Sequence, residues 1–259
     1  MFRLKKLFFS FLVLVFVFLA GFYYWIQDKY VVPILMYHHI SSTDVPGMNV
    51  VNPDVFRKQM NYLQKHGYKV LSLDAIVSSI KNHQSFDHKS VAITFDDGYI
   101  NNYTNAYPVL KEFNYPAIVF MVADVVSSPG YMTWEQLKEM SKNGFSIGSH
   151  TRRHAYLPDV SGEDLVEEIK GSKRILEQGL GQEIKYFSYP SGGFNEEIKK
   201  IVRESGYQAA CTTNRGHGRD NNDVYELKRI RINDDDDGLV LWAKLSGYYN
   251  FFRKARNSH

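Results

Sequence analysis

The chain opens with a long apolar segment and then alternates between short apolar runs and amphipathic stretches. Residues 7–26 carry no charge over 20 positions, about the length a helix needs to cross the hydrocarbon core of a bilayer. The later short runs are rich in β-branched and aromatic residues, which predicts strands. We expect strands at 33–37, 69–73, 91–95, 117–122, 145–149, 186–189 and 207–212, and a weaker one at 227–232.

The amphipathic stretches between these runs carry helix start and stop signals. Asn52-Pro53 supplies an N-cap and a first-turn proline, and Thr133 with Gln136 forms a capping box. Strand and helix alternate about seven times, which predicts an α/β fold with a mostly parallel sheet, either a barrel or an open sheet. In both arrangements functional groups gather at the carboxyl ends of the strands.

The N-terminal segment indicates how the chain is placed relative to a membrane. Arg3, Lys5 and Lys6 precede the apolar run and predict a cytoplasmic amino terminus, with the rest of the chain outside. A cleaved signal peptide needs small residues at its cut site, whereas Ala20-Gly21 is followed at once by aromatic residues. We interpret residues 1–26 as a cytoplasmic stub and membrane anchor and residues 27–259 as an extracytoplasmic domain. Cleavage, which would make the protein secreted, is the alternative.

Charge and cysteine content exclude two classes of function. The net charge of +3 equals the three basic residues before the apolar run, so the remaining chain has 28 basic and 28 acidic residues. Nucleic-acid binders need a basic face, and this balance argues against one. Cys211 is the single cysteine. It excludes an intrachain disulfide and a cysteine-based metal or redox site.

Chemically informative residues follow the predicted strands directly. Asp96 and Asp97 follow the strand at 91–95, and the histidine-rich "SHTRRH" follows the strand at 145–149. His38-His39 follows the first strand, and "YPSGG" follows the strand at 186–189. In a parallel α/β fold these strand ends lie at one rim, so residues distant in sequence are expected to converge.

One acidic residue and two histidines form a plausible ligand set for a metal. A carboxylate with two neutral imidazoles suits Zn²⁺ or a similar divalent ion and leaves coordination positions open. We therefore predict Asp97, His150 and His154 as ligands, with Asp96 beside the metal as a base. A lone Asp-Asp-Gly is most often a turn and a lone His-x-x-x-His a solvated helix face, so the interpretation depends on their joint placement.

Three motifs together resemble the polysaccharide deacetylases, the NodB-homology group of carbohydrate esterase family 4. "TFDDG" at 94–98, "SHTRRH" at 149–154 and "FSYPSGG" at 187–193 resemble the three motifs of that family, and the match covers about 90–232. The resemblance implies a distorted (β/α)7 barrel. "VPILMYHHI" at 32–40 is similar to the branch that includes poly-N-acetylglucosamine deacetylases.

The resemblance also implies roles for individual residues. Asp97, His150 and His154 would hold a divalent metal, Zn first, with Co or Ni as alternatives. Asp96 would be the catalytic base, and His38, in the Tyr37-His38 pair, the catalytic acid. The backbone N–H of Ser191 would stabilise the oxyanion.

One departure from the family pattern concerns the base. Most members have an arginine in the third motif that pairs with the base aspartate, and this chain has Ser188 there. Arg229 or Arg231, near a predicted strand end, is expected to supply the charge instead, unless the base is held differently.

The expected function is metal-dependent hydrolytic N-deacetylation of an N-acetylglucosamine-containing polysaccharide, with release of acetate. The expected partners are that polysaccharide and the membrane, with no nucleic acid. Two alternatives remain open. An O-acetyl esterase would use the same parts, and a catalytically silent glycan-binding protein would explain the missing arginine at position 188.

Overall fold

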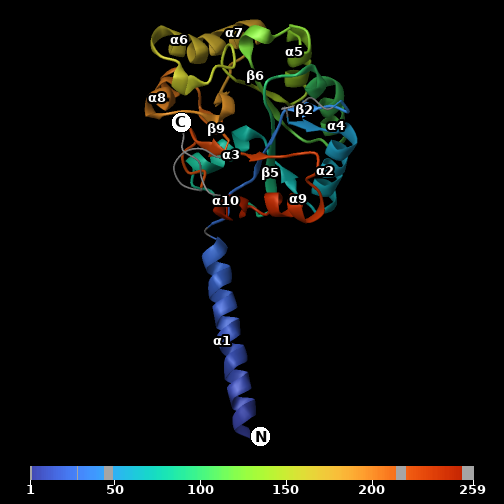
Figure 1. Ribbon diagram of the computed structural model, residues 1–259, viewed down its shortest axis with the longest axis vertical. Helices are drawn as coiled ribbons and strands as arrows, with labels where there is room; N and C mark the ends of the chain where they lie inside the picture. Colours follow the sequence, from blue (N-terminus) through green and yellow to red (C-terminus); the bar gives the residue numbers. More distant parts are fainter. Residues whose placement is uncertain (1, 28, 44–48, 214–219, 253–259) are drawn as a thin grey trace.

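The apolar segment at the start of the chain forms one helix that projects from the rest of the molecule (Figure 1). The computed structural model describes residues 2–27, 29–43, 49–213 and 220–252. Within helix α1 (Phe2–Gln27), the stretch Phe8–Ile26 is long and apolar enough to cross a membrane, and none of it is buried against the protein. A signal sequence would meet the same criterion, so length and composition make this helix a candidate span.

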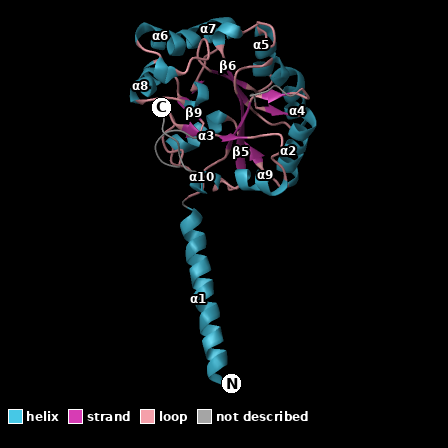
Figure 2. Ribbon diagram, in the orientation of Figure 1, coloured by secondary structure: helices cyan, strands magenta, loops and turns pink. Residues whose placement is uncertain are grey.

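The strands form a nearly closed parallel barrel at the centre of the molecule, with helices around it (Figure 2). Their order is β10-β9-β8-β7-β6-β5-β1-β11, and every pair is parallel. The two end strands, β10 and β11, are successive in the chain, and Arg229 alone separates them. Together they occupy one strand position, the seventh, in the barrel. The strands are β1 (Ile34–Tyr37), β4 (Lys69–Val70), β5 (Ser90–Phe95), β6 (Ile118–Met121), β7 (Ser146–Ser149), β8 (Tyr186–Ser188), β9 (Ala209–Thr212), β10 (Leu227–Lys228), β11 (Ile230–Arg231) and a separate pair, β2 (His39–Ile40) and β3 (Val50–Val51).

This architecture confirms the predicted distorted barrel of seven βα units. The central strands are buried on both faces, which explains why they read as unbroken apolar runs. The predicted strand at 69–73 is shorter than expected, because Ser72 caps α3 and its side chain accepts a hydrogen bond from the Ala75 N–H. The remaining strand, β4, pairs with β5 outside the barrel path.

The helices begin where the sequence signals place them. The Asn52 side chain caps α2, and Thr133 and Gln136 form the predicted capping box of α5. The long amphipathic segment that starts at Ser161 is interrupted by a π-helical turn, and a second π-helical turn follows β5. The helices are α2 (Pro53–Lys65), α3 (Leu73–Lys81), η1 (π, Asn102–Ala106), α4 (Tyr107–Glu112), η2 (3-10, Ala123–Val125), α5 (Trp134–Lys142), η3 (3-10, Leu157–Asp159), α6 (Gly162–Val166), η4 (π, Glu167–Gly171), α7 (Ser172–Leu180), η5 (3-10, Pro190–Gly192), α8 (Glu196–Glu204), α9 (Gly238–Leu245) and α10 (Tyr249–Phe252).

The barrel register decides which loops meet at the rim. Tyr37 of β1 lies opposite Phe95 of β5, so His38 and Asp96 emerge side by side. Ser149 of β7 lies opposite Phe187 of β8, which brings the loop after β7 beside the loop after β8. Parallel pairing therefore collects the ends of four strands over one opening.

Candidate active site and metal centre

The six site residues predicted from the sequence line one pocket at the carboxyl ends of the strands. The pocket has a volume of about 200 Å³. Its walls come from the loops after β1, β5, β7 and β8, as the rim argument predicted. The predicted residues among its lining are His38, Asp96, Asp97, His150, His154 and Ser191.

Three of these side chains converge in the geometry of a metal site. Asp97 Oδ1 lies 3.5 Å from His150 Nε2 and 3.3 Å from His154 Nε2. The ligand atoms of the three residues all lie within 4.8 Å of one another. His150 is fully buried, whereas the His154 side chain is 44% exposed, so the site is closed on one side and open on the other.

The donor atoms themselves fit a divalent cation. Asp97 Oδ1 is buried and has no hydrogen-bond partner within the described part of the chain. A buried carboxylate oxygen without a partner is costly, and a cation between it and the two imidazoles would remove that cost. Asp97 and His154 also have left-handed backbone conformations (φ 71° and 60°). Such strain in non-glycine residues concentrates at functional sites.

A hydrogen bond at its other ring nitrogen orients His150, the buried histidine, toward the possible metal position. His150 Nδ1 lies 2.7 Å from the Ser188 carbonyl oxygen, so Nδ1–H donates there and Nε2 keeps its lone pair for a metal. Burial lowers the pKa of His150, although the carboxylates of Asp96 and Asp97 oppose this. The ring is therefore held neutral, which is the protonation state that metal binding requires.

Asp96 lies beside this triad, and both oxygens of its carboxylate have a hydrogen-bond partner outside the triad. Both of its carboxylate oxygens accept 2.6 Å hydrogen bonds from Arg229. Burial would raise the pKa of Asp96, but the Arg229 charge, with help from His150, outweighs it and holds that pKa well below its usual range. Asp96 is thus ionised, and its closest approach to His150 Nε2 is 3.9 Å, longer than that of Asp97.

Arg229 supplies the charge that the third motif lacks. Its Nη2 also donates to Ser188 Oγ at 2.8 Å, its Nη1 to Thr94 Oγ1 and its Nε to the Thr212 carbonyl. Ser188 therefore accepts a hydrogen bond at the position where most of the family places the arginine itself. Of the two arginines that the sequence left open, Arg231 is exposed and only lines the pocket.

The third motif brings a tight turn to the pocket wall. Ser191 and Gly192 have successive left-handed conformations (φ 53° and 74°). A Cβ at Gly192 would lie 2.3 Å from Thr213 Oγ1, so only glycine permits this approach. Gly192 therefore lets this loop close onto the end of strand β9, with Ser191 at the pocket.

Comparison with known proteins identifies the family. A family model described as polysaccharide deacetylase matches residues 83–210. YxkH of Bacillus subtilis (strain 168), whose name assigns it to the polysaccharide deacetylases, is 35% identical over 211 residues, covering 82% of this chain and 75% of YxkH. The chain belongs to the polysaccharide deacetylase family. Because the family consists of hydrolases that act on amide bonds, this protein is an enzyme of that class.

Solved structures and a second curated relative agree with this assignment. The Streptococcus pyogenes deacetylase PplD, solved in complex with acetate, has a TM-score of 0.76 and 32% identity, over 83% of this chain and 97% of PplD. The poly-β-1,6-N-acetyl-D-glucosamine N-deacetylase of Staphylococcus aureus (strain MSSA476) is 26% identical, over 77% of this chain and 73% of that protein. The resemblance found in the sequence is thereby confirmed.

In this polysaccharide deacetylase, the loop that carries His38 and His39 is held by two asparagines that sequence reasoning missed. The π-helical turn η1 places Asn102 Nδ2 2.6 Å from the His38 carbonyl oxygen and Asn101 Nδ2 2.9 Å from His39 Nδ1. Burial lowers the pKa of His38, although the charges of Asp96 and Asp97 oppose this. His38 Nδ1 is buried without a hydrogen-bond partner among the described residues.

The other π-helical turn, η4, holds the loop between His150 and His154. In η4 the side chain of Glu168 is completely buried and accepts hydrogen bonds from the backbone N–H groups of Arg152 and Arg153, at 3.1 and 3.0 Å. Its other oxygen accepts from Arg153 Nε at 2.6 Å. Both π-helical turns thus carry polar side chains that fix a loop of the pocket. "NNYTN" and "EEIKG" at 101–105 and 167–171 gave no recognisable signal of this.

Replacing Glu168 by glutamine should weaken metal binding by displacing the His150–His154 loop. Glutamine cannot accept from two backbone N–H groups and a guanidinium together, and loss of such outer support typically costs about 10–100-fold in metal affinity. Isothermal titration of the metal-free chain with Zn²⁺ measures this. Glu167→Gln is the matched control, because among the described residues Glu167 pairs with the partly exposed side chains of Arg152 and Arg174, whereas the backbone N–H groups of the loop donate to Glu168. Equal affinities for the two variants would contradict the role of Glu168.

The pocket also contains aromatic side chains to which the sequence assigned no role. The His39 ring stacks on Tyr99 with centroids 3.5 Å apart, and Tyr99 stacks on Tyr131. His39 and Tyr99 form an aromatic wall of the pocket, and Tyr131 supports Tyr99 from behind. The further lining residues missed by sequence reasoning are Met36, Asn49, Tyr99 and Thr213, and His39, noted with His38 after the first strand, lines the pocket as well.

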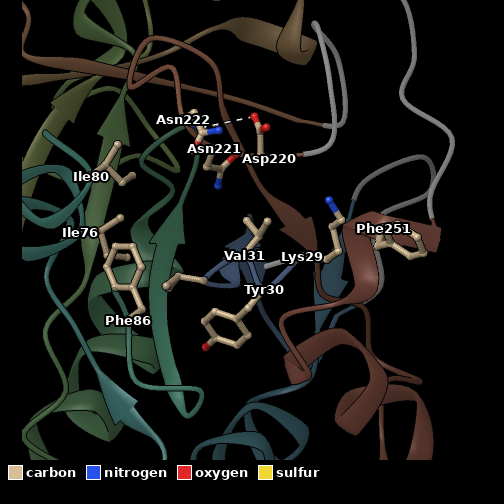
Figure 3. Close-up of a pocket in the computed structure, with 11 residues that line it drawn as sticks. Lys29, Tyr30, Val31, Ile76, Ile80, Phe86, Asp220, Asn221, Asn222 and Phe251 are labelled. Atoms are coloured by element: carbon tan, nitrogen blue, oxygen red, sulfur yellow. Dashed lines mark hydrogen bonds between the residues drawn. The ribbon is translucent and has the colours of Figure 1, made fainter. Parts of the chain in front are cut away.

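A larger pocket of about 420 Å³, drawn in Figure 3, is lined by residues 29–32 before β1 and therefore lies at the end of the barrel opposite the carboxyl ends of the strands. It is formed by Tyr30 and Val31 before β1, by Ile76 and Ile80 of α3, and by residues that include Phe86 and Phe251. Its walls combine these apolar side chains with the polar residues Lys29, Asp220, Asn221 and Asn222. The group found among the described residues that could hold a metal ion, Asp97, His150 and His154, belongs to the smaller pocket, which is therefore the candidate active site.

Proposed function

We propose that this protein removes acetyl groups from N-acetylglucosamine residues of a polysaccharide by metal-dependent hydrolysis, with release of acetate. The observation that carries the proposal is the pairing, in one pocket, of the Asp97–His150–His154 triad with an ionised Asp96 that Arg229 holds outside it. The Staphylococcus aureus relative, whose name states poly-β-1,6-N-acetyl-D-glucosamine as its substrate, supports this substrate class.

The proposed roles follow from the position of each side chain. Asp97, His150 and His154 would hold a divalent metal, Zn²⁺ by the donor set, with Co²⁺ or Ni²⁺ as alternatives. When bound, the metal supplies Lewis-acid activation of water and of the acetamide carbonyl. Asp96 takes a proton from the attacking water, and its two bonds to Arg229 orient it for this.

Two further residues have roles in the proposed reaction, one as the oxyanion donor and one as the acid. The Ser191 N–H, from the left-handed turn at the pocket wall, donates to the developing oxyanion. His38 donates a proton to the leaving amine nitrogen. Because burial lowers the pKa of His38, its protonated form is a stronger acid than an ordinary imidazolium, which favours this transfer.

The proposed setting is the outer face of a membrane. Residues 1–26 form the cytoplasmic stub and anchor, and residues 27–259 the extracytoplasmic catalytic domain; secretion would follow if the segment were cleaved. Support comes from the apolar stretch Phe8–Ile26 and from the basic residues that precede it.

The silent glycan-binding alternative loses its motivation. It depended on the missing arginine at position 188, and Arg229 provides a guanidinium that pairs with Asp96 and reaches Ser188. The O-acetyl esterase alternative uses the same catalytic parts, and the test below separates it.

The test is acetate release by the full chain in detergent from β-1,6-linked N-acetylglucosamine oligomers, beside a chromogenic acetate ester. We expect release from the oligomers, loss of activity after chelation, and recovery on adding Zn²⁺. Activity on the ester alone would favour the esterase, full activity in chelator would contradict the metal site, and tight oligomer binding without release would revive the silent alternative.

A further inference from the structure

The outward face of α9 is strongly apolar. Leu239, Val240 and Trp242 are 82%, 50% and 55% exposed, while Leu241 and Leu245 of the same helix are buried in the core. Outside α1, the other large apolar side chain of comparable exposure among the described residues is Val166. Three such side chains on two turns of helix form a concentrated patch, which we call the α9 face. Patches of this kind mark interaction sites.

The α9 face lies at the end of the barrel from which α1 leaves (Figure 1). The turn after α9 is tied to the segment after α1, because the Val31 N–H donates to the Gly247 carbonyl at 2.8 Å. Tyr30 contacts Tyr248 edge to face, and Trp25 of α1 contacts Phe251 of α10 in the same way. The patch therefore belongs to a surface that is continuous with the end of the candidate membrane span.

We propose that the α9 face rests on the surface of the lipid bilayer beside the point where α1 leaves it. This proposal rests on the membrane anchoring proposed above. A bilayer is the occupant that the geometry favours, because α1 would hold this end of the barrel next to the lipid headgroups at all times. Tryptophan and leucine on an otherwise polar domain are typical of side chains that enter the interfacial region, and Trp25 at the end of the span contacts Phe251 of α10 at this end of the barrel.

Docking in this way fixes where the catalytic pocket points. The segment after α1 enters β1 at its first residue, Ile34, whereas the pocket lies beyond the last residues of the strands. The whole barrel therefore separates the bilayer from the pocket. We infer that the acetylated substrate approaches from the side away from the membrane, as a polymer outside the cell would, and not as a saccharide headgroup lying in the bilayer surface.

Single-tryptophan variants of the full chain in lipid vesicles test the docking. The chain has Trp25, Trp134 and Trp242, so pairwise replacement by phenylalanine leaves one reporter at a time. In vesicles of phosphatidylcholine and phosphatidylglycerol with brominated acyl chains, we expect Trp242 fluorescence to be quenched, as that of Trp25 should be. A Val166→Trp reporter on α6, at the opposite end of the barrel in Figure 1, should stay unquenched.

The outcomes separate docking from anchoring. Quenching of Trp25 without quenching of Trp242 would overturn the docking and leave the anchor standing, whereas no quenching of either would refute the anchor as well. Blue-shifted Trp242 emission without bromine quenching would mean that protein covers the face, and would also overturn the proposal. Leu239→Ser with Val240→Ser should reduce the quenching of Trp242 and leave acetate release from soluble oligomers unchanged; undiminished quenching would contradict the role of the α9 face.

Discussion

Replacing Asp96 by asparagine should nearly abolish deacetylation while the chain keeps its metal. Asparagine cannot take a proton from water, and loss of a positioned general base typically costs about 10²–10⁴-fold in rate. Asp96 lies farther from His150 Nε2 than Asp97 does, and both of its oxygens are engaged by Arg229, so it is not needed as a ligand. Acetate release and metal content of the same purified sample measure the two effects.

Asp97→Asn is the matched control, since it changes the adjacent carboxylate in the same way. It should lose metal as well as activity, because Asp97 Oδ1 is the oxygen that faces both imidazoles. Loss of metal from Asp96→Asn would instead make Asp96 a ligand. The amide also weakens the contact with Arg229, so rates should be compared per folded chain, with thermal unfolding recorded for each variant.

The parallel α/β fold and the residues of its site were predictable from the strand pattern, whereas the barrel, as opposed to an open sheet, was implied by the family resemblance. Strands buried on both faces read as unbroken apolar runs, and polar residues directly after them must lie at the rim of a parallel barrel. Asp96, Asp97, His150 and His154 follow β5 and β7 in this way, and all four line the pocket. The motif resemblance added His38 and Ser191, which line it too.

The supporting contacts were not predictable, because they depend on side-chain geometry without a sequence period. The sequence left Arg229 and Arg231 as equal candidates, and only the break between β10 and β11 turns Arg229 into the barrel. The π-helical turns that present Asn102 and Glu168 are single-residue departures from helical spacing, to which periodicity is insensitive. The left-handed conformation of Asp97 likewise has no sequence signal, because aspartate adopts it more often than most residues but still at a minority of positions.

Replacing Arg229 by methionine should have the largest effect on stability of any single change in the site. Arg229 is fully buried, and its guanidinium donates to both oxygens of Asp96, to Thr94, to Ser188 and to the Thr212 carbonyl. Removing it leaves the buried Asp96 carboxylate without a counter-charge, which costs about 3–5 kcal/mol in comparable sites. For a chain of this size the midpoint of thermal unfolding should fall by roughly 10 °C or more. Unfolding of the full chain in detergent measures it.

Two further variants separate the loss of the Arg229 charge and its hydrogen bonds from the loss of packing alone. Arg229→Lys keeps the charge but offers three donors from one nitrogen, so it should still lose much of the activity, because Asp96 is oriented by a two-pronged contact. The exchange Ser188→Arg with Arg229→Ser returns the guanidinium to the position that most of the family uses, within reach of the same carboxylate. It should recover part of the activity lost in Arg229→Met. If neither stability nor turnover improves in the exchanged chain, the guanidinium acts only from position 229, and its bonds to Thr94 and Thr212 matter as much as its charge.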